Sequence, residues 1–261
     1  MFTHNISPEF FSVGPLTIYW YGLLFVIGVV LAYFVLRSIY KEQKYKLEDL
    51  DSVGIYLFIG LVVGARLGHI VFYDFDYFWK NPLEILQVWN GGLASHGAAI
   101  GVFVAYLVWI AVHKVKFFKY ADALVVAFPL VATFVRLGNF VNSEIVGIPT
   151  DSAVGVTFVQ LGENFARHPV QLYSSLMNLS IFVVLIVLYK KYYKKSTDGF
   201  FLFLYMGLYF IGRFVVEFWK DLHALPESFP LSMGQVLSIA PVLIAAVYFI
   251  FYFPKLNKGK N

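Results

Sequence analysis

The chain has no cysteine and little charge. Only 14% of its 261 residues are charged and 59% are hydrophobic, compared with roughly 45–50% apolar residues in soluble domains. Without cysteine, the chain itself has no disulfides, thiolate nucleophiles or cysteine-ligated metals, so any thiol in its chemistry would belong to a substrate. The sequence also lacks HExxH and phosphate-binding glycine motifs, and we expect no metal, nucleotide or other cofactor. Residues 1–15 have no basic n-region or cleavage site, which predicts no removable signal peptide.

Apolar residues gather in seven stretches of the length that a bilayer core requires. The predicted spans are 16–36, 53–72, 97–113, 121–137, 170–189, 199–219 and 234–253. The fourth is the weakest in length. We therefore expect an all-α integral membrane protein with seven transmembrane helices, forming a single polytopic domain over residues 1–261.

Basic residues between the spans predict the orientation of the chain. Fourteen follow the odd-numbered spans: Arg37, Lys41, Lys44, Lys46, Lys114, Lys116, Lys119, Lys190, Lys191, Lys194, Lys195, Lys255, Lys258 and Lys260. The other loops contain only Lys80, Arg167 and Lys220. We therefore expect a cytoplasmic C-terminus and an extracytoplasmic N-terminus. The net charge of +4 comes from these basic loops, and we expect no nucleic-acid partner.

Two long segments are predicted to face outward. Residues 73–96 are rich in aromatic side chains, which is typical of an interfacial arm. Within it, Asn81 is expected to be the N-cap and Pro82 the first position of a short amphipathic helix. Residues 140–169 form the longest polar stretch and are expected to make a small extracytoplasmic head.

Three further basic residues, Arg66, Arg136 and Arg213, lie within or at the ends of apolar spans. Any one of them could extend its charged end to the membrane interface, as long basic side chains often do. The predicted orientation, however, places all three in the outer half of the membrane. Three arginines at one level favour an anion site.

The most polar membrane boundary is Arg136-Leu-Gly-Asn-Phe-Val-Asn-Ser-Glu-Ile-Val-Gly147, the signature stretch. A helix cap followed by an ordinary interfacial loop is one interpretation. The stretch nevertheless has more polar side chains than capping requires. Gly138 and Gly147 bracket these side chains, which predicts a helix end whose backbone comes close to a ligand.

Other residues could complete such a site. Tyr209, Arg213 and Glu217 share one helix face by spacing, although a structural Arg213–Glu217 pair would explain two of them. His96 lies between glycines that would leave open space around a proton acceptor. His168 is placed to cap or orient the start of the fifth span.

Glycines recur at four-residue spacing in the second and third spans. They are Gly60, Gly64 and Gly68, and Gly97 and Gly101. Small residues on one helix face allow another helix to approach closely.

The signature stretch closely resembles that of the bacterial prolipoprotein diacylglyceryl transferases. The similarity extends along nearly the whole chain. It includes Trp20-Tyr21-Gly22, Gly64-Ala-Arg66-Leu-Gly68, Gly91-Gly-Leu-Ala-Ser-His96-Gly97, His168-Pro-Val-Gln171-Leu-Tyr173, Tyr209 with Arg213-Phe-Val-Val-Glu217-Phe, and Met233-Gly234-Gln235.

The resemblance implies a multi-pass enzyme of the bacterial cell membrane that begins lipoprotein maturation. Its substrates would be phosphatidylglycerol and prolipoprotein signal peptides with a lipobox cysteine. The diacylglyceryl group would move to the cysteine thiol, forming a thioether and releasing glycerol 1-phosphate. His96 would be the base or a headgroup ligand, and Arg136 and Arg213 would hold the phosphate. Substrate-binding residues would be Tyr21, Arg66, Asn139, Asn142, Glu144, Gly147, Tyr209 and Glu217.

A lipid or anion transporter is the alternative from another class. Transporters more often have internal repeats and polar groups in both halves of the membrane. The sequence contains no convincing repeat, and its polar cluster lies at the predicted outer side. The transferase interpretation is therefore favoured.

Overall fold

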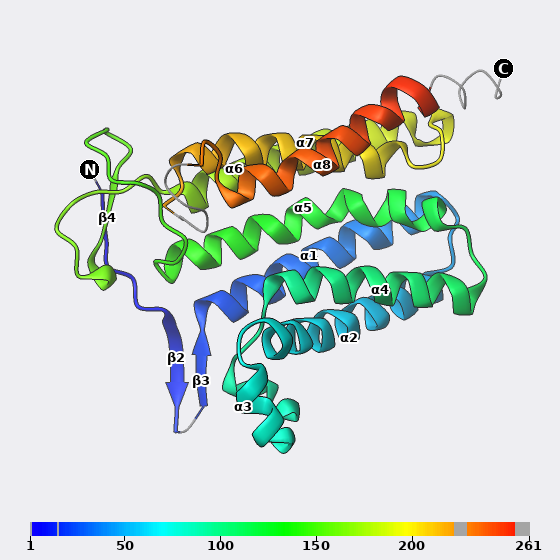
Figure 1. Cartoon of the computed structure of the whole chain (residues 1–261). Coiled ribbons are helices and arrows are strands. Elements are labelled where there is room, and N and C mark those ends of the chain that lie inside the picture. Colours follow the sequence, from blue (N-terminus) through cyan, green and yellow to red (C-terminus); the bar gives the residue numbers. More distant parts are fainter. Residues whose placement is uncertain (1, 15, 222–228, 254–261) are drawn as a thin grey trace. The chain divides into compact units, whose positions relative to one another are not determined.

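A computed structural model describes residues 2–14, 16–221 and 229–253 of the chain. These residues include seven helices that are long and apolar enough to cross a membrane (Figure 1). The helices are α1 (Trp20–Glu42), α2 (Leu47–Phe72), α4 (Ser95–His113), α5 (Phe117–Val141), α6 (Val170–Tyr192), α7 (Phe200–Val216) and α8 (Met233–Val247). The seven predicted spans are confirmed, and the chain is a multi-pass membrane protein. It folds as two compact units, Met1–Leu36 with Ala121–Asn261 (the first unit) and Arg37–Tyr120 (the second unit).

In the second unit, α2 and α4 touch backbone to backbone. A Cβ built on Gly64 would lie 2.6 Å from Gly101 Cα, and one built on Gly68 would lie 2.6 Å from Gly97 Cα. No larger residue fits at these positions without moving a helix. The close approach predicted from the glycine spacing is confirmed.

The predicted arm of the second unit contains α3 (Phe75–Lys80) and two 3-10 turns, η1 (Pro82–Leu86) and η2 (Val88–Asn90). Pro82 begins η1 as predicted, but the side chain of Asn81 makes no capping bond. Instead, Asn81 Nδ2 donates to the carbonyl of Tyr77 at 3.0 Å. A short 3-10 turn leaves few N–H groups to cap, and the asparagine closes the end of α3 instead.

The first unit combines membrane helices with a small head. Strand β1 (Phe2–His4) pairs in parallel with β4 (Val156–Phe158), which precedes the 3-10 turn η3 (Val159–Leu161). Strand β2 (Glu9–Val13) pairs antiparallel with β3 (Leu16–Tyr19), so the first predicted span begins in a strand and becomes helical only at Trp20. Figure 1 shows β4 and its loops beyond the end of α5.

Helices α6, α7 and α8 pack side by side in the first unit, α6 against α7 and α7 against α8 (Figure 1). Short turns continue their carboxyl ends, namely η4 (Tyr193–Lys195), η5 (Glu217–Trp219) and the π-helix η6 (Tyr248–Tyr252). Buried Asp122 of α5 accepts hydrogen bonds from the backbone N–H groups of Gly199 and Leu202, at 2.7 and 2.8 Å. The carboxylate thereby caps α7 and ties it to α5.

Candidate active site

The signature stretch lies at the carboxyl end of α5, where its polar side chains form one network. Arg136 Nη1 donates to Asn139 Oδ1 at 3.3 Å, and Asn139 Nδ2 donates to Glu144 Oε2 at 2.9 Å. Asn142 Nδ2 donates to the other carboxylate oxygen, Glu144 Oε1, at 3.1 Å. Glu144 thus orients both asparagines, and Asn139 in turn steadies the guanidinium of Arg136.

The helix end differs from the prediction. Gly138 lies inside α5, and a Cβ built there would lie 2.8 Å from Cδ2 of Tyr21, so that the tyrosine ring packs on this glycine. The left-handed residues are Ser143 and Ile145, with φ of 54° and 55°. A β-branched residue with this backbone is strained by about 1–3 kcal/mol, and such strain is concentrated at functional sites.

Gly147 allows two distant segments to cross. Its N–H donates to the carbonyl of His168 at 3.0 Å, while the N–H of Asp221 donates to the carbonyl of Val146 at 3.2 Å. Gly147 and Lys220 face each other in an antiparallel bridge, which brings Lys220 beside the signature stretch. His168 contributes to this crossing through its backbone, just before α6 begins. This is a positioning role at the start of the fifth span.

Arg167 reinforces this crossing from the head. Its guanidinium forms ion pairs with Glu163 and Asp221, and it donates to the carbonyl of Gly147 at 3.1 Å. Hydrogen bonding to Arg167 lowers the pKa of Glu163 below its ordinary range. This cation is therefore fully engaged by protein groups.

A narrow cavity of about 30 Å³ opens beside the crossing. Its lining residues come from α5, α6, α7 and the segments that follow α5 and α7: Arg136, Ile145, Val170, Gln171, Ser174, Met177, Asn178, Tyr209, Arg213, Val216, Glu217 and Lys220. Three cationic side chains and one carboxylate thus meet around this cavity. Such an excess of positive charge favours an anionic ligand.

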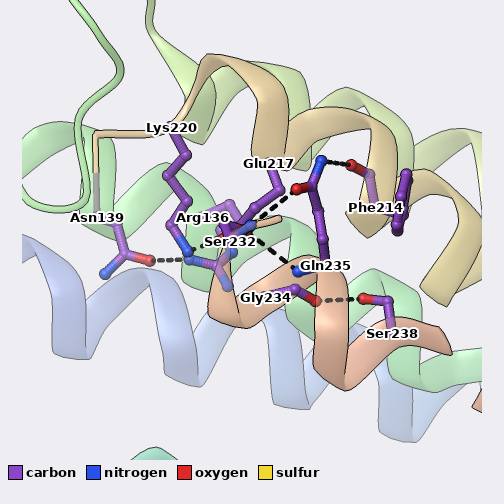
Figure 2. A network of polar contacts seen from close by, with 9 residues as sticks. All are labelled: Arg136, Asn139, Phe214, Glu217, Lys220, Ser232, Gly234, Gln235 and Ser238. Carbon is purple, nitrogen blue, oxygen red and sulfur yellow. Dashed lines mark hydrogen bonds and ion pairs between the residues drawn. The ribbon is translucent and has the colours of Figure 1, made fainter. Parts of the chain in front are cut away.

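The carboxylate of the cavity belongs to Glu217, which is only 8% exposed. It pairs with Lys220, whose Nζ lies 3.5 Å from Glu217 Oε2 (Figure 2). The expected alternative, an Arg213–Glu217 ion pair, is absent from the described residues. Gly234 at the start of α8 packs directly on the Glu217 carboxylate, so any side chain at that position would displace it.

Lys220 is a partly buried cation that lies among other cations. Burial lowers the pKa of its ammonium below the ordinary value of 10.5. Glu217 opposes this effect, while the charges of Arg136 and Arg213 add to it. A bound anion would relieve the repulsion among the three cations.

Arg136 and Arg213 have no carboxylate partner within ion-pair distance in the described parts of the chain. The only hydrogen bond of the Arg136 guanidinium there goes to neutral Asn139. Unlike Arg167, these two arginines keep their charge uncompensated by the protein. Both guanidinium groups can therefore bind an external anion.

The second unit holds the other two predicted residues. Arg66 is buried, and its guanidinium donates to four backbone carbonyls of the arm, those of Glu84, Ile85, Gly91 and Gly92, at 2.6–3.2 Å. It thereby holds the arm in place. His96 is exposed in the first turn of α4. Their substrate roles stay predictions.

The cavity residues that sequence reasoning missed include Lys220, Gln171 and Asn178. Lys220 follows Arg213 by seven residues, or about two helical turns, and this spacing could have placed it on the same face. Gln171 and Asn178 are also seven residues apart, on α6. Polar side chains at helical spacing in an apolar span were the available signal.

The fold and site define a multi-pass membrane protein with a polar, cationic cavity at the ends of its helices. Among the described residues, no cluster of three or more His, Asp or Glu side chains could hold a metal ion. A family model described as prolipoprotein diacylglyceryl transferase matches residues 8–252. The chain belongs to this family.

Curated relatives span nearly the whole chain. A protein of Tolumonas auensis is 42% identical over 245 residues, which cover 93% of this chain and 94% of the relative. Relatives from Chloroherpeton thalassium and Bacteroides fragilis are 37% and 36% identical, over 95% and 98% of this chain and 92% and 96% of their own lengths. All three are named phosphatidylglycerol–prolipoprotein diacylglyceryl transferase.

Proposed function

We propose that this chain transfers the diacylglyceryl group of phosphatidylglycerol to the thiol of the lipobox cysteine in a prolipoprotein. The observation that carries the proposal is the pair Arg136 and Arg213, which line one cavity without carboxylate partners among the described residues. Membership of the family supports the reaction type, and the names of the relatives support both substrates.

The reaction is a displacement at the carbon of the diacylglycerol unit that carries the phosphate ester oxygen. The thiol sulfur forms a bond to this carbon, the carbon–oxygen bond breaks, and the bonding electrons leave with glycerol 1-phosphate. Negative charge therefore grows on the phosphate in the transition state. Arg136, Arg213 and Lys220 stabilise that charge most strongly at this point, which is how fixed cations accelerate a reaction.

The polar network around the cations keeps them in place. Glu144 and Asn139 orient Arg136, and Glu217 holds the ammonium of Lys220. Asn142 shares the Glu144 carboxylate. A preorganised set of donors pays little reorganisation energy when the phosphate arrives.

The thiol must lose its proton, because the thiolate is the nucleophile and an ordinary thiol has a pKa of about 8.5. His96 is the proposed base. The competing role for this residue is binding of the headgroup, with the cationic field alone lowering the pKa of the thiol. A His96→Gln enzyme that kept the wild-type rate and pH profile would exclude the role of base.

The proposed orientation puts this chemistry on the outer side of the membrane. Basic residues after the odd-numbered spans predict a cytoplasmic tail. The carboxyl end of α5 and the amino end of α6 would then face outward, where a translocated signal peptide presents its cysteine. Accessibility labelling of cysteines introduced in the head, in intact cells, tests this orientation.

The decisive experiment combines purified protein, phosphatidylglycerol and a lipobox peptide, followed by mass spectrometry of the peptide. We expect a diacylglyceryl adduct that disappears with a Cys→Ser peptide and with Arg136→Ala or Arg213→Ala protein. The matched control is Arg37→Ala, which removes an exposed arginine elsewhere. Lipid movement between leaflets without an adduct would refute the proposal and favour a transporter.

A further inference from the structure

Two residues that line the cavity, Gln171 and Asn178, have buried amide oxygens without a hydrogen-bond partner among the described residues. Gln171 and Asn178 are each 1% exposed and line the same cavity. Gln171 Nε2 donates to the carbonyl of Glu144 at 2.7 Å, and Asn178 Nδ2 donates to that of Ser174 at 2.7 Å. Their oxygens, Oε1 and Oδ1, are left without a partner among the described residues. Buried polar atoms are nearly always paired, so each of these oxygens requires an explanation.

The chemistry of an amide oxygen limits what can pair with these atoms. An amide oxygen accepts hydrogen bonds and does not donate them, so the partner must carry a hydrogen-bond donor. A hydroxyl group meets this requirement.

We infer that Gln171 Oε1 accepts a hydrogen bond from a hydroxyl of the donor lipid's headgroup and so selects a polyol headgroup. The inference rests on the proposed function, because it assigns the headgroup to the cavity that holds the donor phosphate. The ligand class is a phosphodiester lipid whose headgroup is an uncharged polyol.

Position distinguishes Gln171 from Asn178. Gln171 lies in the first turn of α6 and bonds to the signature stretch through Glu144, near the membrane boundary where headgroups lie. Asn178 lies seven residues further along the helix, roughly 10 Å deeper. One headgroup hydroxyl cannot serve both oxygens, so Asn178 pairs with a different group, such as a water.

The neighbouring charges support an uncharged headgroup. Arg136, Arg213 and Lys220 line the same cavity and repel the ammonium groups of ethanolamine and choline lipids. Choline also lacks a hydrogen-bond donor for Gln171. A glycerol headgroup supplies hydroxyl donors without positive charge.

The test compares phosphatidylglycerol with phosphatidyl-1-propanol of the same acyl chains, which has the same phosphodiester and no headgroup hydroxyl. The readout is the ratio of kcat/KM for the two lipids with a lipobox peptide. We expect wild-type protein to prefer phosphatidylglycerol by about tenfold or more, because a buried acceptor left unpaired disfavours the analogue. Gln171→Met should bring this ratio close to one.

Two further variants separate selection from structure. Gln171→Glu keeps an acceptor oxygen and loses the donor to Glu144, so both lipids should react more slowly while the preference remains. Asn178→Leu removes the other buried amide from the same cavity and should keep the preference. The inference is overturned if Gln171→Met retains the wild-type ratio, or if Asn178→Leu reduces the ratio equally.

Lipid binding measured by native mass spectrometry makes this test independent of catalysis. If wild-type protein formed no adduct yet bound phosphatidylglycerol over phosphatidyl-1-propanol through Gln171, the transferase proposal would fail while the headgroup site stood. If adducts formed and neither the kinetic nor the binding preference depended on Gln171, only the headgroup site would fail.

Discussion

Replacing Gly147 by alanine should abolish most of the transfer activity while the helices of the first unit stay folded. A Cβ at this position would lie 2.5 Å from the carbonyl oxygens of both His168 and Trp219. These two oxygens accept the hydrogen bonds of Gly147 and Ile148, at 3.0 and 2.9 Å. The added methyl group therefore strikes the same backbone atoms that hold the crossing together, and backbone cannot rotate away as a flexible side chain can.

The magnitude follows from the contacts that would be lost. Overpacking costs about 1–3 kcal/mol, and each backbone hydrogen bond contributes about 1 kcal/mol. The added methyl group clashes with two fixed carbonyl oxygens, so the strain is about 5 kcal/mol when each clash costs about 1–3 kcal/mol. Opening the crossing relieves this strain and detaches the segment that carries Lys220 from the signature stretch, but it breaks two backbone hydrogen bonds of about 1 kcal/mol each. The open form is then favoured by about 3 kcal/mol and the competent fraction falls by roughly 10²-fold, since 1.4 kcal/mol corresponds to a factor of ten. We therefore expect a fall in kcat/KM of about this size.

The assay pairs transferase kinetics with hydrogen exchange at the amides of Ile148 and Asp221, which bond across the crossing. Gly155→Ala is the matched control in the same head, because the nearest atom to its added Cβ lies 3.0 Å away, in the side chain of Ala166. The reasoning is refuted if Gly147→Ala keeps activity within about twofold of wild type, or if exchange at these amides is unchanged.

Three further changes have defined outcomes. Asp122→Ala removes the carboxylate that caps α7 and should lower the unfolding free energy by about 1–2 kcal/mol, read as a lower Tm. Arg167 lowers the pKa of Glu163 from its ordinary 4.5, so the pair stabilises the head above that pH and the stabilisation is lost as the pH falls through the lowered value. In thermal melts recorded from neutral to acidic pH, the Arg167→Ala protein should not show this pH-dependent loss of stability. Burial lowers the pKa of Lys220, so the affinity for phosphatidylglycerol should begin to fall with rising pH at values below 10.5. The Lys220→Arg variant, measured by binding titrations over the same pH range, should keep its affinity because arginine stays charged.

The membrane helices were predictable because length and apolar content decide whether a segment can span a bilayer. The bounds were less so. The fourth predicted span, 121–137, is part of α5, which continues for four residues at each end. Asp122, an acidic residue, lies at the start of the predicted span. Hydropathy cannot indicate that its carboxylate accepts hydrogen bonds from the N–H groups at the start of α7. This tertiary contact satisfies a carboxylate that would otherwise be unpaired within an apolar helix.

The cavity was predictable in part for a similar reason. Side chains within one helix face or one signature stretch, such as Arg136 with Asn139 or Tyr209 with Arg213, follow from local spacing. Lys220 was counted only among outward loop cations. Its position depends on the crossing at Gly147, which joins segments more than seventy residues apart. Spacing along the chain could indicate the shared face with Arg213, but not that crossing.

Arginines in apolar spans give the same signal in sequence and have different environments in the structure. Arg66 donates to four carbonyls of the arm, and any residue can supply a backbone carbonyl, so no pattern announces this use. Arg136 and Arg213 have no carboxylate within ion-pair distance in the described chain and line one cavity. An uncompensated cation beside hydrocarbon is costly unless a ligand neutralises it. These arginines therefore differ in the acceptors that the fold supplies to them, and in the proposed function a lipid phosphate would supply the acceptor that Arg136 and Arg213 lack.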